Sequence, residues 1–291
     1  MMAGEAEQPA PEETRLPDSL AERRPLPGSA PLLLREDAAG VATLVLNRPA
    51  ARNGLSVALL EALAAALAGI AADDAVRCVV IAAEGPVFCA GHDLKEIAAH
   101  FGDADGGRAF FADSMAACCG VMAALPALPQ PVVAAVQGMA TAAGCQLAAA
   151  CDLVVASEGA RFCTPGVDIG LFCSSPAVAL SRVVPRRAAM EMLLTADPID
   201  AEEARRIGLV NRVVPAEALR AEAQALAARI AGRSALAVRL GKRTFHRQAG
   251  LPLAEAYEVA SAAMVRNLLA EDAAEGIGAF LARRTPEWRH R

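Results

Sequence analysis

The chain has 291 residues, which is enough for one large domain with its own hydrophobic core. Hydrophobic residues make up 55% of it but aromatic residues only 3%, so the core must be built from Ala, Leu, Val and Ile. The net charge of −5 argues against a nucleic-acid partner, because no domain-scale basic excess exists to neutralise phosphates. The eight cysteines form no CxxC pair and the four histidines are dispersed. We therefore expect buried, reduced thiols, no metal site and a cytoplasmic location.

The N-terminal segment differs in composition from the rest. Residues 1–30 are rich in Pro, Glu, Ala and Arg and show no sustained hydrophobic period, which predicts a mobile extension. This segment begins acidic and lacks an apolar run, so it does not have the features of a signal peptide. Gly, Pro, Gln or charged residues interrupt the longest apolar stretches farther along. We expect no transmembrane helix and no membrane partner.

Strands and helices alternate in the pattern from residue 32 onward. Strands are predicted at 41–46, 76–83, 131–136 and 152–156, and helices at 56–70, 108–125 and 143–151. Ser56 is a plausible N-cap of the first helix, and the second helix is expected to end before Pro126. Alternating elements of this kind predict an α/β fold with right-handed crossovers. Further helices are expected at 175–184, 185–195, 201–207, 216–230 and within 254–282. Their leftover apolar faces predict packing against another subunit.

Two turns rich in small residues lie about fifty residues apart. They belong to the segments FCAGHDLKE, at 88–96, and QGMATAAGCQL, at 137–147. Each follows an apolar strand and precedes a helix, which leaves backbone N–H groups free to bind an oxyanion. A pair of such turns is what the polarisation of a thioester carbonyl requires.

Four segments in order resemble the signatures of the enoyl-CoA hydratase/isomerase family, the crotonase superfamily. They are FCAGHDLKE, AAVQGMATAAGCQLAAACDLVVAS, RFCTPGVDIGLF and DPIDAEEARRIGLVNRVVP. The resemblance implies a crotonase-like spiral of strand-strand-helix units followed by C-terminal trimerisation helices. It divides the chain into an acyl-CoA-binding core at 31–225 and a helical oligomerisation region at 226–291. An acyl-CoA thioester is the implied ligand and a homotrimer or dimer of trimers the implied assembly. Coenzyme A enters as part of the substrate, so no separate cofactor is expected.

The resemblance also assigns roles to individual residues. The backbone amides of His92 and Ala143 are the expected oxyanion donors. Contacts with the thioester and with coenzyme A are expected from Arg52, Ala90, Gly91, Asp93, Lys95 and Gly144. Arg283 and Arg284 resemble the family's basic C-terminal segment. The alternative interpretation of the four cations, Arg52, Lys95, Arg283 and Arg284, is that they are solvated surface charges without a role in binding.

Two departures from the family pattern bear on the mechanism. Family hydratases use two glutamates, and the matching positions hold Gln146 and Gly166, neither of which can transfer a proton near neutral pH. Asp168 is the nearest substitute carboxylate in sequence, and Gln146 is expected to orient a water or the thioester. Structural roles are the alternative for both residues. Efficient hydration is therefore not expected. The two turns could still stabilise a thioester enolate, in a reaction of fatty-acid or related acyl-CoA metabolism. Decarboxylation, isomerisation and non-catalytic acyl-CoA binding are also compatible with the residues that are present.

Overall fold

The computed structural model describes residues 30–291, so all but the last residue of the predicted N-terminal extension lies outside the described residues. The first of its two sheets has six strands in the order β1-β2-β3-β5-β7-β10. They are β1 Leu33–Ala38, β2 Val41–Leu46, β3 Cys78–Ala83, β5 Val132–Val136, β7 Leu153–Ser157 and β10 Arg212–Val214. Only β1 runs antiparallel to its neighbour; the other pairings in this sheet are parallel.

A second sheet of four short strands has the order β4-β6-β8-β9. They are β4 Val87–Cys89, β6 Met139–Thr141, β8 Arg161–Cys163 and β9 Ile199–Asp200. The strands β4, β6 and β8 each follow directly on a strand of the large sheet, and each is followed by a helical segment. Three successive strand-strand-helix units therefore stack side by side, which confirms the predicted crotonase-like α/β fold.

The helices account for most of the remaining residues. They are α1 Val57–Ala71, α2 Leu94–Ala99, α3 Arg108–Ala127, α4 Ala143–Ala150, α5 Ser174–Val183, α6 Arg186–Thr195, α7 Ala201–Arg206, α8 Leu219–Ala231, α9 Ala235–Gln248, α10 Leu253–Leu268 and α11 Glu271–Leu281. Short 3-10 helices lie at Pro49–Ala51, Pro165–Ile169 and Ala216–Ala218. The prediction that α3 ends before Pro126 was wrong. Pro126 removes one amide donor, but the last turn still closes because Leu128 N donates to Ala124 O at 2.8 Å.

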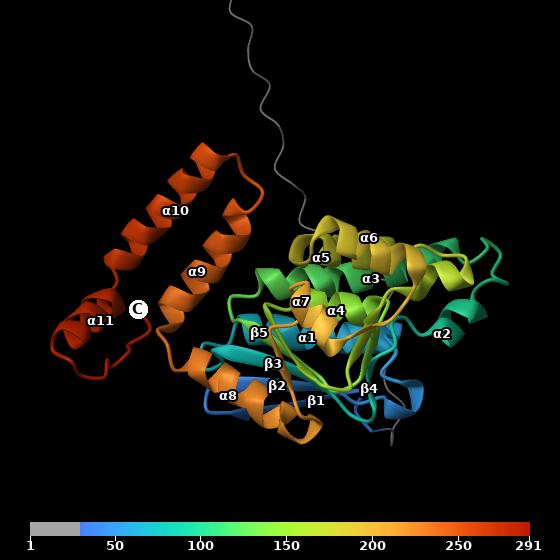
Figure 1. Ribbon diagram of the computed structural model, residues 1–291, viewed down its shortest axis with the longest axis horizontal. Coiled ribbons are helices and arrows are strands. Elements are labelled where there is room, and N and C mark those ends of the chain that lie inside the picture. Colours follow the sequence, from blue (N-terminus) through green and yellow to red (C-terminus); the bar gives the residue numbers. More distant parts are fainter. Residues whose placement is uncertain (1–29) are drawn as a thin grey trace, which may run out of the picture.

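Side chains alternate between the two faces of the large sheet, and each face packs on a different set of helices. Val41 and Val45 pack with Leu226 of α8, whereas Leu44 and Leu46 pack with residues of α1, α3 and α4. Figure 1 shows α8 on one side of the large sheet and α3 and α4 on the other. By length and composition α3 also passes for a membrane span. A core helix passes the same test, and α3 buries Val121 and Leu125 in this core.

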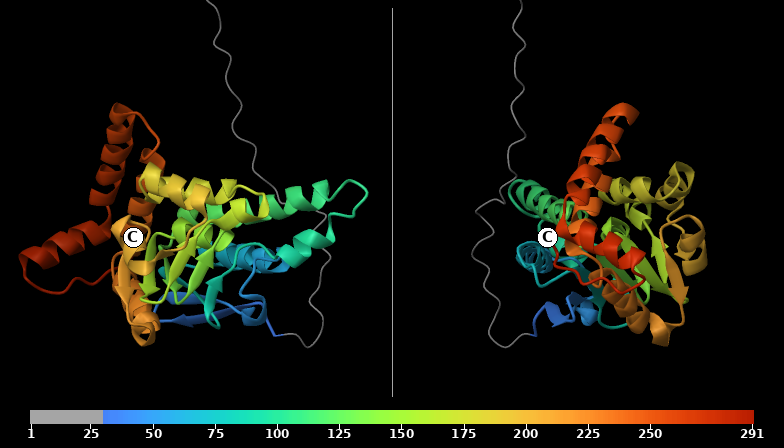
Figure 2. Two further views of the ribbon diagram at one scale, coloured as in Figure 1. Left: turned by 45° about the vertical axis from the view of Figure 1, so that its right-hand side comes forward. Right: turned by 90° about the vertical axis from the view of Figure 1, so that its left-hand side faces the viewer.

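The C-terminal helices α9, α10 and α11 form an arm, of which α10 and α11 project from the layered body in Figure 1 and in the left view of Figure 2. Within the single chain α10 buries none of its residues, and several of its large apolar side chains are exposed. The arm is held to the body by Lys242 of α9, whose Nζ donates to Asp152 Oδ2 at 2.6 Å. The same Nζ donates to Leu125 O and Gln130 O, at 2.9 and 3.0 Å. The predicted boundaries, 31–225 and 226–291, stay predictions.

Candidate active site

The first turn lies between β4 and α2, and its backbone is held against the segment before α1. Ala90 N donates to Arg52 O at 3.0 Å, Leu55 N donates to Gly91 O at 2.7 Å, and Asp93 N donates to Leu55 O at 3.3 Å. Gly91 has φ 85°, which an L side chain rarely adopts. Among residues 30–291 the His92 amide has no hydrogen-bond acceptor. One N–H of this turn is therefore left for a ligand.

The second turn lies between β6 and α4. Ala142 N donates to Cys163 O, and Gln146 N donates to Ala142 O, both at 3.0 Å. Ala142 itself has φ 52° and ψ −120°, an unusual conformation for a residue with a side chain. Ala143 is the first residue of α4, so its amide has no acceptor within the helix. Nor has it one elsewhere in the described part of the chain.

Glycines bring the two turns into contact. A Cβ on Gly91 would lie 2.9 Å from Ala142 Cβ and 3.2 Å from Ala143 N. A Cβ on Gly144 would lie 2.1 Å from Cys89 O, so only glycine fits at that position. Because the turns touch, the unpaired amides that precede α2 and begin α4 belong to one site. This arrangement suits an oxyanion hole, in which two N–H groups bind one oxygen.

Asp93 holds the first turn in place. Its carboxylate caps α2 by accepting from Lys95 N and Glu96 N, at 3.1 and 3.4 Å, and pairs with Arg48 at 2.9 Å. Burial opposes ionisation, but the Arg48 guanidinium and the capping amides outweigh it and hold the pKa of Asp93 below its usual value. Its predicted contact with coenzyme A stays a prediction. Arg48 was not identified from the sequence, because its partner lies 45 residues away.

The positions that the resemblance assigns to glutamates lie in protein interior. Gln146 is 4% exposed, and its Oε1 has no hydrogen-bond partner within the described chain. Gly166 is buried, and a Cβ there would lie 2.9 Å from Cys173 Sγ and 3.1 Å from Leu171 O. Asp168, the predicted substitute, is exposed on the same short 3-10 helix. The buried part of the site therefore offers an amide and a thiol where carboxylates were sought.

Other groups near the turns are poorly suited to proton or acyl transfer at neutral pH. Burial raises the pKa of the Cys89 thiol to about 12 and also raises the pKa values of Cys145 and Cys173. Burial lowers the pKa of His92, so its imidazole is neutral, and its Nδ1 has no partner among residues 30–291. A neutral imidazole can donate or accept a hydrogen bond but carries no charge.

Two exposed cations lie beside the first turn. The carbonyl of Arg52 accepts a hydrogen bond from Ala90 N in that turn, and Lys95 is the second residue of α2, the helix that follows it. Their side chains make no ion pair with a described residue. In contrast, Arg284 pairs with both carboxylate oxygens of Glu275, at 2.6 and 2.7 Å, and holds the pKa of Glu275 at about 2. Arg52 and Lys95 are therefore better placed than Arg284 to bind phosphate.

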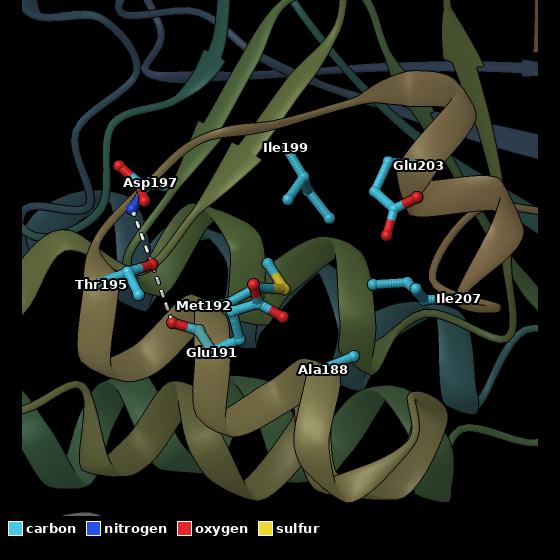
Figure 3. Close-up of a pocket in the computed structure, with 8 residues that line it drawn as sticks. All are labelled: Ala188, Glu191, Met192, Thr195, Asp197, Ile199, Glu203 and Ile207. Carbon is cyan, nitrogen blue, oxygen red and sulfur yellow. Dashed lines mark hydrogen bonds between the residues drawn. The ribbon is translucent and has the colours of Figure 1, made fainter.

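A separate pocket of about 230 Å³ lies among α6, β9 and α7 (Figure 3). It is lined by Ala188, Glu191, Met192, Thr195, Asp197, Ile199, Glu203 and Ile207. None of these residues belongs to either turn. Two contacts join the pocket to the segment around Gly166: Met192 O accepts from Thr164 Oγ1 at 2.9 Å, and Ile199 pairs with Phe162 of β8. It does not supply the missing acid or base.

The spiral of strand-strand-helix units and the two contacting turns define a protein of the crotonase fold. The family model described as Enoyl-CoA hydratase/isomerase matches residues 36–291, and the chain belongs to that family.

Relatives and solved structures agree with this assignment. The mouse protein named "Enoyl-CoA hydratase domain-containing protein 3, mitochondrial" is 48% identical over 86% of this chain and 82% of its own length. The crystal structure of the human domain-containing protein 3 is 45% identical, covers 89% of this chain and 100% of its own, and has a TM-score of 0.84. An enoyl-CoA hydratase structure from Mycobacterium smegmatis is 49% identical, with a TM-score of 0.85 over 89% of this chain and 99% of its own.

The prediction of a cytoplasmic location was wrong. The mouse and human relatives are both named mitochondrial, which points to the mitochondrion instead. The prediction rested on reduced cysteines, and buried thiols report a reducing surrounding without identifying the compartment.

Proposed function

We propose that the chain binds an acyl-CoA thioester so that its carbonyl oxygen accepts hydrogen bonds from the amides of His92 and Ala143. The observation that carries this proposal is the contact between two turns that each present an unpaired N–H. In the bound thioester these donors stabilise the negative charge of an enolate. Removal of one such donor typically reduces a rate by about 10²–10³. The phosphates of coenzyme A bind near Arg52 and Lys95, the exposed cations beside the first turn.

The reaction is not efficient hydration by two glutamates. Neither Gln146 nor Gly166 has a side chain that can give up or take up a proton near neutral pH, and loss of one general acid or base typically reduces a rate by about 10²–10⁴. Decarboxylation of a malonyl-type thioester makes smaller demands on a base. In it the electrons of the breaking C–C bond pass into the enolate as CO₂ leaves. Isomerisation needs a proton carrier, so it is the weaker alternative. The metabolic setting that we propose is fatty-acid or related acyl-CoA metabolism.

A non-catalytic acyl-CoA-binding role is the second candidate function. It is favoured by the protonated thiols near the turns and by the lowered pKa of His92, which makes its imidazole a weaker base than usual.

Turnover separates the two functions. Purified protein is titrated calorimetrically with butyryl-CoA and incubated with enoyl-, 3-hydroxyacyl- and malonyl-type thioesters, with products separated by chromatography. If the protein is an enzyme, we expect conversion of at least one thioester. Binding of butyryl-CoA without conversion of any thioester supports the non-catalytic binding role. Failure to bind butyryl-CoA contradicts both.

The assembly that we propose is a homotrimer or a dimer of trimers. The support is α10, a 16-residue helix with no buried residue in the single chain. Large apolar side chains exposed to this degree are typical of an interface between subunits.

A further inference from the structure

The C-terminal tail, residues 285–291, folds back from α11 onto the place where the arm leaves the body. Trp288 Nε1 donates to Gly232 O at 3.1 Å, at the end of α8. A Cβ on Gly276 of α11 would lie 3.0 Å from the same indole ring, so the ring packs directly on that helix. Figure 1 shows the C-terminus beside α11 and the start of α9. The tail therefore ties α11 to the junction of α8 and α9.

Asp272 anchors the tail to α11. Its Oδ1 accepts from Arg289 N at 2.7 Å and from His290 N at 3.1 Å, and its Oδ2 accepts from His290 N at 3.0 Å. Asp272 N in turn donates to Arg291 O at 3.1 Å. The residue is only 3% exposed. These bonds fix the backbone of His290, whose ring extends to the body.

Both ring nitrogens of His290 face N–H donors. Nδ1 lies 3.1 Å from the amide of Ala235, the first residue of α9. Nε2 lies 2.8 Å from a guanidinium nitrogen of Arg77, which directly precedes β3. A neutral imidazole has one acceptor nitrogen and satisfies one of these donors, whereas an imidazolium has none. Protonation therefore replaces the hydrogen bond by a contact between two donors and adds a positive charge beside Arg77.

The charges around the docked ring also disfavour an imidazolium. Arg77 faces the ring from the body, and Arg239 of α9 donates to the carbonyl that precedes Arg77, at 3.3 Å, and pairs with Asp74. Asp272 of α11 accepts from backbone amides of the tail. Neither Arg77 nor the ring of His290 forms an ion pair with a carboxylate among residues 30–291. The docked position thus suits a neutral ring.

We propose that the tail is a pH-sensitive strap, which holds α11 on the body while His290 is neutral and releases it when the imidazole is protonated. An exposed histidine ordinarily binds a proton below about pH 6.5. A released tail takes up this proton and a docked tail does not, so linkage makes docking strongest above that pH. Docking then weakens as the pH falls, by up to about tenfold per pH unit. This inference is independent of the proposed thioester binding.

Hydrogen exchange in the full chain measures the opening of the strap. The amides of Arg289 and His290 donate to Asp272 in the docked tail, so they exchange when the strap opens. Ordinary carboxylates stay ionised between pH 8 and pH 6. For wild type we expect the protection of these amides, corrected for intrinsic exchange rates, to fall about fourfold over this range. The amides of β3 are the internal reference and should keep their protection.

Three variants identify the titrating group. His290→Gln keeps an acceptor but does not titrate, so its protection should be the same at pH 8 and pH 6. His290→Lys carries a permanent charge and can only donate. We expect little protection at either pH, and stronger acrylamide quenching of Trp288, which is the single tryptophan of the chain. His246→Gln is the matched control, since this histidine also lies on the arm but faces Asp152 at 3.4 Å. It should retain the wild-type response.

Four outcomes overturn the inference. They are pH-independent protection in wild type, an unchanged response in His290→Gln, wild-type protection in His290→Lys at pH 8, and loss of the response in His246→Gln. If His290→Gln does not dock at pH 8, Arg77→Gln decides instead. It removes the cation beside the ring, so the response should shrink, and an undiminished response overturns the inference.

Discussion

A Cβ on Gly91 would lie 3.2 Å from the amide nitrogen of Ala143, which places the backbones of two distant turns in contact. Parallel pairing of β4 with β6 produces this contact, since Cys89, the last residue of β4, lies opposite Ala140, the middle residue of β6. The amides of His92 and Ala143, which have no acceptor among residues 30–291, lie three residues beyond Cys89 and Ala140. The small sheet thus brings the two turns together.

Ala142 carries backbone strain that glycine would relieve. With φ 52° and ψ −120°, its Cβ costs about 1–3 kcal/mol, whereas glycine loses about 0.5–1 kcal/mol through greater freedom in the unfolded chain. We expect Ala142→Gly to increase the free energy of unfolding by about 1 kcal/mol, measured by chemical denaturation. A clear decrease would show that the side chain of Ala142 makes stabilising contacts that outweigh the strain.

Gly91→Ala tests the contact between Gly91 and Ala142. The added Cβ meets Ala142 Cβ at 2.9 Å and also occupies a left-handed backbone conformation. We expect a loss of about 2 kcal/mol or more in the wild-type background and a smaller loss in the Ala142→Gly background, because one of the clashing atoms is then absent. Equal losses in both backgrounds would contradict the contact between the turns.

Hydration of crotonyl-CoA should be slow in wild type and should respond to restored carboxylates only when space is made for them. A side chain at position 166 collides with Cys173 Sγ, so Gln146→Glu with Gly166→Glu is expected to gain little. Adding Cys173→Ala removes the sulfur. We expect the triple variant to be about 10²-fold or more faster than wild type, measured by loss of enoyl thioester absorbance.

Asp168→Asn is the control for this experiment. If wild type hydrates crotonyl-CoA well and Asp168→Asn does not, the exposed carboxylate has taken over the role of the glutamates. An inactive triple variant that is folded and binds acyl-CoA would contradict the assignment of positions 146 and 166.

The buried ion pair between Lys242 and Asp152 should dominate the stability of the C-terminal arm. The side chain of Lys242 is 7% exposed, and Lys242→Met removes its donor from two carbonyls and its positive charge from the Asp152 carboxylate, which keeps only the amide of Val132 at 2.7 Å and His246 at 3.4 Å among the described residues. We expect a loss of about 3–5 kcal/mol in the free energy of unfolding at fixed protein concentration. Lys242→Met with Asp152→Asn should lose less than the sum of the two single changes. Arg243→Met, at the exposed neighbouring position, is the control and should change little.

The exposed apolar face of α10 should be the contact between subunits. Met264 and Leu268 lie one turn apart and are 59% and 58% exposed in the single chain. In sedimentation velocity we expect wild type to be a trimer or hexamer and Met264→Asp with Leu268→Asp to dissociate. A buried unpaired carboxylate costs about 3 kcal/mol or more at each interface. Arg266→Asp, on the opposite side of α10, tests whether the effect is local. A monomeric wild type would contradict the assembly.

Local patterns in the sequence predicted much of the fold. The strand at 41–46 is confirmed, and Ser56 caps α1 by accepting from Leu59 N at 3.3 Å. The strands β4, β6 and β8 have three residues each, too few for a periodic signal. The helix α9 was missed because basic residues and Gly241 interrupt its apolar residues along the sequence, although those residues share one face of the helix.

The site divides in the same way. The two turns were located from glycine and neighbouring strands, which are local signals. The proximity of Cys173 to Gly166, which leaves no space for a side chain at position 166, depends on the tertiary fold. So does the pairing of Arg48 with Asp93, and the sequence pattern therefore revealed neither.

Infrared difference spectroscopy of bound butyryl-CoA, labelled with ¹³C at the thioester carbonyl, tests the oxyanion hole most directly. Hydrogen bonds from the amides of His92 and Ala143 polarise the carbonyl, so we expect its stretching frequency to fall below the value in water. Ala143→Pro removes one donor at the first position of α4, where a helix tolerates proline, and should lose much of this shift. A bound carbonyl with the same frequency as in water would contradict the proposed role of the two turns.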